Sequence, residues 1–531
     1  MTDRMDASVE KPSGPADMEV SSDKLFCCRG VRNKVPLTYR EELYHILRMT
    51  GPLLLSRILN YMLPFVVTMF CGRLGNDVMA GYGLASATIN VSTAATGTGL
   101  ALACDTLVSQ TFGGKNLLRV GVILQRGIII LLLFCLPCWG LLINAEAILL
   151  CLGQDPEVAR IAQLYITAFL PAVPAMFLHH LQVSYLQNQG IILPQMYTAA
   201  LANLANVVTN YIFLYWLDLG VGGSAAAHTL AWIYICAFLF VYIWWKKLHV
   251  STWGGWSAES LQEWGSYMKL AIPSTLMTCF EWWVYEFGGF FAGMLGEDEL
   301  AAQHAVIMVA FITYMFPLGV QAAACARVGN ALGAGDTDRA ILSAKMSLAL
   351  AGLFLVCVPV YLHTCLYSRT SIHETLCVCT GIFLGTGKQK IPAVANLIGY
   401  YCTGLSLSIT LMFVVKLGVL GFWLGLLICV VLQSTFYIIV IFKLNWKRMT
   451  DEGEHVDHDP KSSHLSITQL IIRRGLTMFA AVGLLAVGVG VYFLVPLPET
   501  LPANSTMDWI NSTDTPDQIF TGVLVTLEEM A

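Results

Sequence analysis

The sequence predicts an all-α polytopic membrane protein in which two parallel six-helix repeats precede one extra C-terminal helix. Composition is the first reason: of 531 residues, 56% are hydrophobic and 12% are charged, and mean hydropathy is +0.65. Length is the second, because the apolar runs repeatedly exceed the roughly 20 residues that a helix needs to cross a bilayer. The third is a set of landmarks that recurs at equal spacing in both halves of the chain.

The apolar runs give the expected order of elements. In the first half they lie near 50–71, 79–108, 118–145, 157–187, 190–215 and 221–245. After a polar connector at 246–263, further runs lie near 266–295, 299–328, 340–366, 391–415, 418–442 and 468–495. A shorter apolar piece covers about 372–386.

Prolines and glycines reveal the repeat. The same interval separates them in both halves, namely 23 residues for Pro52–Gly75 and Pro273–Gly296, and 26 residues for Pro194–Gly220 and Pro392–Gly418. The segment 109–114 (SQTFGG) likewise parallels 329–334 (GNALGA). Because an even number of spans separates the halves, they are expected to be parallel repeats about an axis along the membrane normal.

The equal spacing of the two halves is lost at one place. Pro194 follows Gln110 by 84 residues, whereas Pro392 follows Asn330 by 62, so about 22 residues are absent from the fourth helix of the second repeat. That is most of one spanning helix at ~1.5 Å per residue. What remains, Ile372–Thr386, is too short to cross as a regular helix. It is either re-entrant or takes in residues from 361–370.

Two carboxylates, Glu281 and Glu286, stand inside the apolar run that ends near 295. Acidic side chains at membrane depth usually face an aqueous cavity or bind a proton. At about 100° per residue, with Glu281 at zero, Tyr285 falls near 40°, Trp282 near 100° and Glu286 near 140°. Carboxylates and aromatic rings on one face suit an organic cation, and burial lets a carboxylate hold a proton instead. The alternative is a core helix whose acids are satisfied by polar neighbours.

Other functional classes lack support. A net charge of −5 and the absence of a basic recognition pattern exclude nucleic-acid binding. The 16 cysteines show no disulfide spacing, and no catalytic constellation indicates an enzyme. His179 and His180 are expected to be packed or cavity-lining. Asp105 is expected to pair with Arg57 or Arg327, as a structural gate or in transport.

Lysine and arginine placement gives the orientation. The loops that carry most of them should be cytoplasmic; these bases are Lys115, Arg119, Lys246, Lys247, Arg327, Arg339, Lys345, Lys388, Lys390, Lys447, Arg448, Arg473 and Arg474. Two glycosylation acceptors, Asn504 and Asn511, support an extracellular C-terminus. The expected divisions are a cytoplasmic tail (1–45), a first lobe (46–248), a connector (249–263), a second lobe (264–446), a polar cytoplasmic linker (447–467) that is more typical of a solvated disordered loop than of a metal site, a thirteenth helix (468–495) and an extracellular tail (496–531).

Several motifs together resemble one transporter family. They are Gly51-Pro52, CGRLG at 71–75, CDTLVSQT at 104–111, GVILQR at 121–126, NQGIILPQ at 188–195, EWWVYE at 281–286 and RVGNALGAGD at 327–336. From about Arg40 to Trp446 the chain resembles the multidrug and toxin extrusion (MATE) family, above all its vertebrate branch, which carries a thirteenth helix. The resemblance implies a V-shaped pair of lobes, alternating access and export of organic cations in exchange for protons at the plasma membrane.

The resemblance also implies site residues. It places cation and proton binding on Glu281, Glu286 and Glu374, with Trp282, Tyr285 and Asn90 lining the same cavity. No cofactor other than the coupling proton is implied, the partners are small organic cations, protons and the lipid bilayer, and a monomer is expected.

The chain departs from the family pattern in three places. The truncation precedes Glu374, and Met308 stands where relatives carry an acid. Arg57 replaces a neutral polar residue of the first helix; it is either a snorkelling or ion-paired side chain, or a positive charge that narrows cation binding. Two alternatives to proton exchange stay open: sodium-coupled efflux, and a truncated, transport-inactive form with a regulatory or interaction role.

Overall fold

The computed structural model describes residues 36–361, 365–455 and 466–497, and no strand occurs among them. The predicted glycosylation acceptors Asn504 and Asn511 lie outside this part of the chain. So do the side chains of Glu374 and Met308, although both residues belong to described helices.

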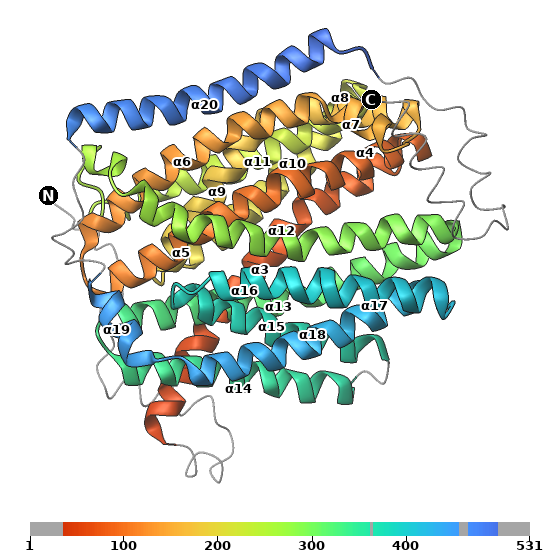
Figure 1. Ribbon diagram of the computed structural model, residues 1–531. Helices are drawn as coiled ribbons and strands as arrows, with labels where there is room; N and C mark the ends of the chain where they lie inside the picture. The colour runs from red at the N-terminus through yellow and green to blue at the C-terminus, as the bar shows by residue number, and fades with distance from the viewer. Residues whose placement is uncertain (1–35, 362–364, 456–465, 498–531) are drawn as a thin grey trace, which may run out of the picture.

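The first lobe is a bundle of long helices (Figure 1). Its elements are α3 (Leu37–Cys71), α4 (Asn76–Ile89), η1 (Asn90–Ala94), α5 (Ala95–Gly113), α6 (Leu117–Ile143), α7 (Ala145–Cys151), α8 (Pro156–Phe169), α9 (Ala172–Gln187), α10 (Leu193–Tyr211), η2 (Ile212–Trp216) and α11 (Gly220–Trp245). A π-helical turn, η1, joins α4 to α5, and another, η2, ends α10. Helix α3 starts at Leu37, so residues 37–45 of the expected N-terminal tail belong to the first helix.

The second lobe repeats this order below the first in the view of Figure 1. Its elements are η3 (Ala258–Leu261) in the connector, then α12 (Trp264–Leu295), α13 (Glu297–Gly333), α14 (Thr337–Tyr361), α15 (Cys365–Gly385), α16 (Lys390–Asn396), η4 (Leu397–Leu405), α17 (Ser406–Ile409), η5 (Thr410–Val414) and α18 (Gly418–Lys443). Helices α19 (Trp446–His455) and α20 (Ile467–Leu494) follow.

Backbone conformation supports the predicted repeat. Gly75 and Gly296, which the spacing pairs, have φ of 129° and 140° and directly precede α4 and α13. Gly220 and Gly418 have φ of 54° and 57° and begin α11 and α18. These conformations favour glycine, so the two halves place the same residue type at the same turns.

The two lobes differ where the register predicts a loss. Between α6 and α10 the first lobe has α7, α8 and α9, whereas the described residues between α14 and α16 form one helix, α15. Helix α15 begins at Cys365, so the shortened piece takes in residues 365–370, as one of the two alternatives expects. Its 21 residues span roughly 30 Å at 1.5 Å per residue.

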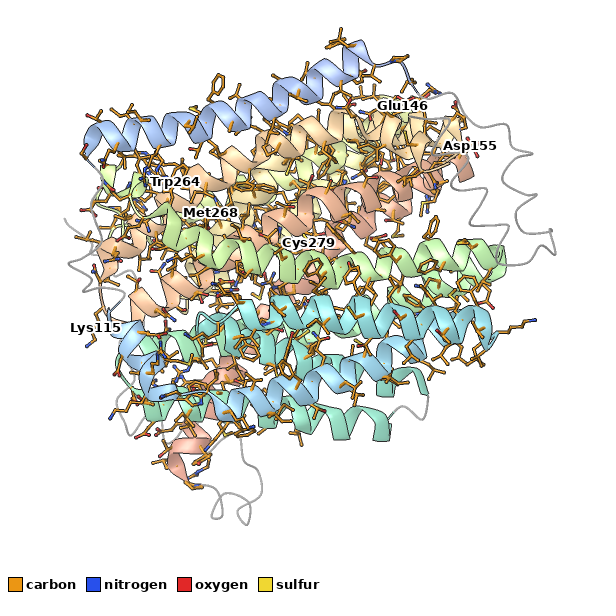
Figure 2. The ribbon with its side chains drawn as sticks, viewed as in Figure 1. Lys115, Glu146, Asp155, Trp264, Met268 and Cys279 are labelled. Atoms are coloured by element: carbon orange, nitrogen blue, oxygen red, sulfur yellow. The ribbon has the colours of Figure 1, made fainter. Side chains whose placement is uncertain are left out.

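Helix length and composition indicate a multi-pass membrane protein. Within the described residues, seven helices are long and apolar enough to cross a bilayer, and the bent pair α8–α9 makes an eighth. Helices α12 and α13, of 32 and 37 residues, are also long enough to span. Figure 2 shows Lys115 at one end of the bundle and Glu146 and Asp155 at the other, and we call these the Lys115 end and the Asp155 end.

The extra helix α20 lies on the outside of the first lobe, along α6 (Figure 1). The two helices touch closely at Gly140 and Gly488, where a Cβ added to Gly488 would overlap the backbone of Gly140. Asn144 Nδ2 donates a hydrogen bond of 2.8 Å to the Gly488 carbonyl at the same crossing. At the other end of α20, Arg474 donates to the Leu261 carbonyl over 2.8 Å.

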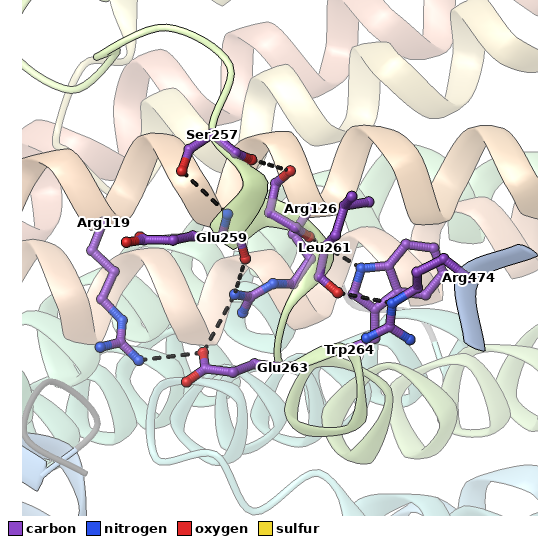
Figure 3. Close-up of polar contacts among 9 residues, drawn as sticks. Arg119, Arg126, Ser257, Glu259, Leu261, Glu263, Trp264 and Arg474 are labelled. Carbon is purple, nitrogen blue, oxygen red and sulfur yellow. Dashed lines mark hydrogen bonds and ion pairs between the residues drawn. The ribbon is translucent and has the colours of Figure 1, made fainter. Parts of the chain in front are cut away.

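The connector between the lobes is fastened to α6 and α20 (Figure 3). Arg119 and Arg126 of α6 both reach the carboxylate of Glu263, at 3.5 and 3.3 Å. The Arg474 guanidinium lies 4.2 Å from the ring centroid of Trp264, the first residue of α12, in a cation–π arrangement. Helix α20 therefore contacts both α6 and the start of α12.

Part of the polar linker after α18 is helical. Helix α19 buries Met449, and Glu452 forms ion pairs with Lys388 at 2.8 Å and Arg448 at 2.9 Å. The expectation of a solvated loop is therefore wrong for residues 447–455, because an apolar side chain and ion pairs hold this segment on the second lobe.

Candidate transport cavity

A cavity of about 160 Å³ lies between the two lobes. The first lobe contributes residues of α3, α5 and α9, and the second contributes residues of α12, α13 and α15. The residues that line it are Arg57, Thr98, Leu102, Asp105, His180, Gln187, Met277, Thr278, Glu281, Trp282, Tyr314, Leu318, Gln321, Ala322, Cys325, Leu376, Cys377, Thr380 and Leu384.

The carboxylates of the cavity are each held by neutral donors. Glu281 of α12 accepts a hydrogen bond of 2.9 Å from the Tyr314 hydroxyl of α13. Asp105 of α5 is 4% exposed and accepts from the side-chain amides of Gln187 at 3.0 Å and Asn188 at 2.5 Å. Neither of these two carboxylates is therefore in an ion pair within 4.0 Å among the described residues.

Arg57 of α3 faces the same cavity and is partly exposed there. No described residue forms an ion pair with it within 4.0 Å. The expected pairing of Asp105 with Arg327 is wrong, because Arg327 forms a bidentate ion pair with Glu42, with Nε donating over 2.9 Å. Arg57 is therefore not ion-paired among the described residues, and a positive charge that narrows cation binding stays a prediction.

The sequence-predicted residues separate into groups. Glu281 and Trp282 line the cavity, whereas Tyr285 is not among the lining residues and packs its ring 6.1 Å from that of Trp423. Glu286 and Asn90 are exposed. Of these five candidates, Glu281 and Trp282 line the cavity and the other three do not.

Glu286 and Asn90 border the point where the lobes separate. The indole nitrogen of Trp283 donates a hydrogen bond of 2.9 Å to the Val91 carbonyl, which joins α12 to η1. Asn90 precedes Val91, and Glu286 lies one turn beyond Trp283 toward the Asp155 end. The main neighbours of α4, which continues past this point, are α8, η1 and α3 of its own lobe.

At the Lys115 end the lobes are closely joined. The Thr106 hydroxyl donates to the Leu384 carbonyl at 2.6 Å, and the Gln110 amide donates to the Gly385 carbonyl at 3.0 Å. The Glu42–Arg327 ion pair adds a link between α3 and α13. The cavity is thus closed on this side.

Sequence reasoning missed two residues that shape this interface. Tyr314 is a single tyrosine in an apolar helix, and no sequence signal sets it opposite Glu281. Glu42 falls within the expected N-terminal tail, although acidic residues before an apolar run, here Glu41 and Glu42, are a signal for a helix start. His179 is buried beside Trp232 and His180 lines the cavity, as expected.

A charged cavity between two repeated bundles of membrane-spanning helices defines a membrane transporter built from parallel repeats. The fold and the cavity define this class of protein but not the family, which similarity to other proteins identifies. A profile of the MatE family matches residues 52–212 and 273–373. The two matches begin at Pro52 and Pro273, the paired prolines of the repeats, and the second ends immediately before Glu374.

Known relatives agree with this match. The chain is 49% identical over 464 residues to multidrug and toxin extrusion protein 1 of Danio rerio, covering 82% of this chain and 78% of the relative. It is 44% identical over 490 residues to the Homo sapiens protein of the same name, covering 87% and 86%. The crystal structure of a eukaryotic MATE transporter superimposes with a TM-score of 0.72 at 24% identity, covering 79% of this chain and 99% of that one.

The chain therefore belongs to the MATE family of multidrug and toxin extrusion transporters, and it is a multi-pass membrane protein of the family's V-shaped two-lobe fold rather than an enzyme.

Proposed function

We propose that this chain exports small organic cations in exchange for protons by alternating access. The observation that supports the proposal best is Glu281, an acid at membrane depth that lines the interlobe cavity beside Trp282 and accepts a hydrogen bond from Tyr314. A carboxylate beside an indole ring can hold a cation by charge pairing and by cation–π attraction of ~0.5–2 kcal/mol.

The exchange follows from competition for one carboxylate. A proton from the acidic side neutralises Glu281 and releases the cation there; when the cavity opens to the other side, the proton leaves and the next cation binds. Glu286 and Asn90, which are exposed where the lobes separate, would receive the departing cation. Glu374, on α15, would supply a further acid.

The proposed setting is the plasma membrane, with the chain acting as a monomer. The lysines and arginines of the Lys115 end favour a cytoplasmic location for that end. This orientation puts the N-terminus inside and the C-terminus outside, and the side on which the lobes separate toward the cell exterior.

The test is gradient-driven flux in proteoliposomes. We expect an imposed proton gradient to drive uptake of labelled tetraethylammonium, and Glu281→Gln to abolish it. Glu157→Gln serves as the matched control, because Glu157 is an exposed acid of α8 paired with Arg160 on the surface. Uptake that ignores the proton gradient, or that survives Glu281→Gln, would contradict the proposal.

Two further arms separate the alternatives. Exchange of sodium for potassium abolishes uptake if the coupling ion is sodium. A version with the roughly 22 residues restored before Glu374, compared with this chain, detects a transport-inactive form: activity in the restored protein alone would assign this chain a regulatory or interaction role.

A further inference from the structure

The cavity holds charges of both signs. The charged side chains among its described lining residues are Arg57, Asp105 and Glu281, so a fixed positive group shares the space with two acids. Like charges within one low-dielectric cavity repel. A ligand that carries only positive charge therefore meets attraction from Glu281 and Asp105 and repulsion from Arg57.

Arg57 is not neutralised by its surroundings. Its guanidinium has no ion-pair or hydrogen-bond partner among the described residues, and Asp105 acts on it only at longer range. Asp105 is instead bonded to Gln187 and Asn188, and Glu281 is bonded to Tyr314. A charge without a partner in a low-dielectric cavity is costly, and charge-assisted bonds to a carboxylate or phosphonate would offset that cost.

The two oppositely charged groups come from different lobes. Arg57 belongs to α3 of the first lobe and Glu281 to α12 of the second, and no ion pair within 4.0 Å joins them. A ligand with a cationic and an anionic end can therefore bridge the lobes without displacing an internal ion pair. The cavity of about 160 Å³ is smaller than the roughly 300–1,000 Å³ of drug-sized sites, so in this state the ligand is compact.

We infer that the preferred ligands of this site are small zwitterions, whose ammonium group binds Glu281 and whose carboxylate binds Arg57. The inference rests on the proposed function, because it assigns a substrate class to the same cavity. Arg57 is here a specificity-determining residue, and its charge discriminates against ligands that lack an anionic group.

The test compares glycine betaine with choline, which share a trimethylammonium group and differ in a carboxylate. Equilibrium binding of both labelled probes is measured on the purified full chain. The wild-type protein should bind betaine more tightly, and Arg57→Gln should shift the betaine-to-choline affinity ratio toward choline by roughly ten- to hundredfold, the effect of losing a charged hydrogen-bond partner. Arg57→Lys should keep part of the preference, and Arg160→Gln, an exposed surface arginine, should keep all of it.

The outcomes separate the inference from the proposed function. Tighter binding of choline by the wild-type protein, or no binding of either probe at millimolar concentration, overturns the inference even if Arg57→Gln does not fold. Choline binding that rises with chloride in the wild type but not in Arg57→Gln also overturns it, because chloride would then occupy Arg57. A betaine preference that depends on Arg57, without proton-driven flux of either probe, supports the site and contradicts the transport proposal.

Discussion

Gly113 of α5 and Gly333 of α13 occupy equivalent positions of the two repeats, and each packs against the other's helix. A Cβ built on Gly113 would overlap the carbonyl of Asn330, and one built on Gly333 would overlap the carbonyl of Gln110. Because Gln110 and Asn330 are also equivalent in the repeat, the contact is reciprocal. The two lobes thus meet at the Lys115 end through a symmetric crossing of backbones.

This crossing predicts a sharp response to small substitutions. Gly113→Ala or Gly333→Ala should lower the free energy of unfolding by about 1–3 kcal/mol, because the added methyl group forces the helices apart. Thermal unfolding of the purified protein measures the effect. Gly289→Ala is the matched control, since this helical glycine of α12 has open space beside it and should tolerate a methyl group. Equal effects at all three positions would contradict the close crossing.

The buried ion pair between Glu42 and Arg327 should also be sensitive to single changes. Glu42 is 4% exposed and accepts from Ser343 at 2.6 Å as well as from Arg327. Arg327→Ala leaves the carboxylate unpaired and should cost about 3–5 kcal/mol. The measurement is a double-mutant cycle with Glu42→Gln, in which the second substitution should recover part of the loss. The exposed pair Arg160–Glu157 provides the control, and removal of either partner should change stability little.

Tyr314 is predicted to position the carboxylate of Glu281. Tyr314→Phe removes one hydrogen bond, worth about 1 kcal/mol, and should weaken ligand binding roughly fivefold while the protein stays folded. Binding of the same betaine and choline probes reports this change, and the affinities for both should fall together because Glu281 binds the ammonium group of each. Tyr197→Phe, at an exposed tyrosine of α10, should have no effect. A change in the ratio of the two affinities would point to a role through Arg57 instead.

Attachment of α20 is predicted to depend on Gly488. Gly488→Leu should separate α20 from α6 and break the contacts at Asn144, because the crossing has no room for a side chain. Reduced thermal stability and a changed Trp264 fluorescence, reporting the displaced Arg474, would show it. Gly483→Leu is the control on the same helix, as its Cβ position faces open space. Identical behaviour of the two variants would show that α20 is not held at this point.

Sequence periodicity and spacing were sufficient to predict the helices and the two repeats. Helices and turns depend on local chemistry, because runs of apolar residues form spanning helices and glycines such as Gly75 and Gly296 mark turns with positive φ. The lost segment shows as a difference in landmark spacing between the two halves. The position of Glu281 at the cavity was also predictable, because a carboxylate in a membrane helix needs an aqueous surface or a partner wherever the helix packs.

Tertiary structure alone decided which residues share the cavity. On a helical wheel, Tyr285 lies closer to Glu281 than Trp282 does. In the structure, however, Tyr285 packs toward Trp423, and it is Trp282 that lines the cavity. Arg57, Asp105, Glu281 and Tyr314 meet from four helices far apart in sequence, so no local pattern could join them. The physical reason is that helix formation is set within a few residues, whereas a cavity and its charges are set by how whole helices cross.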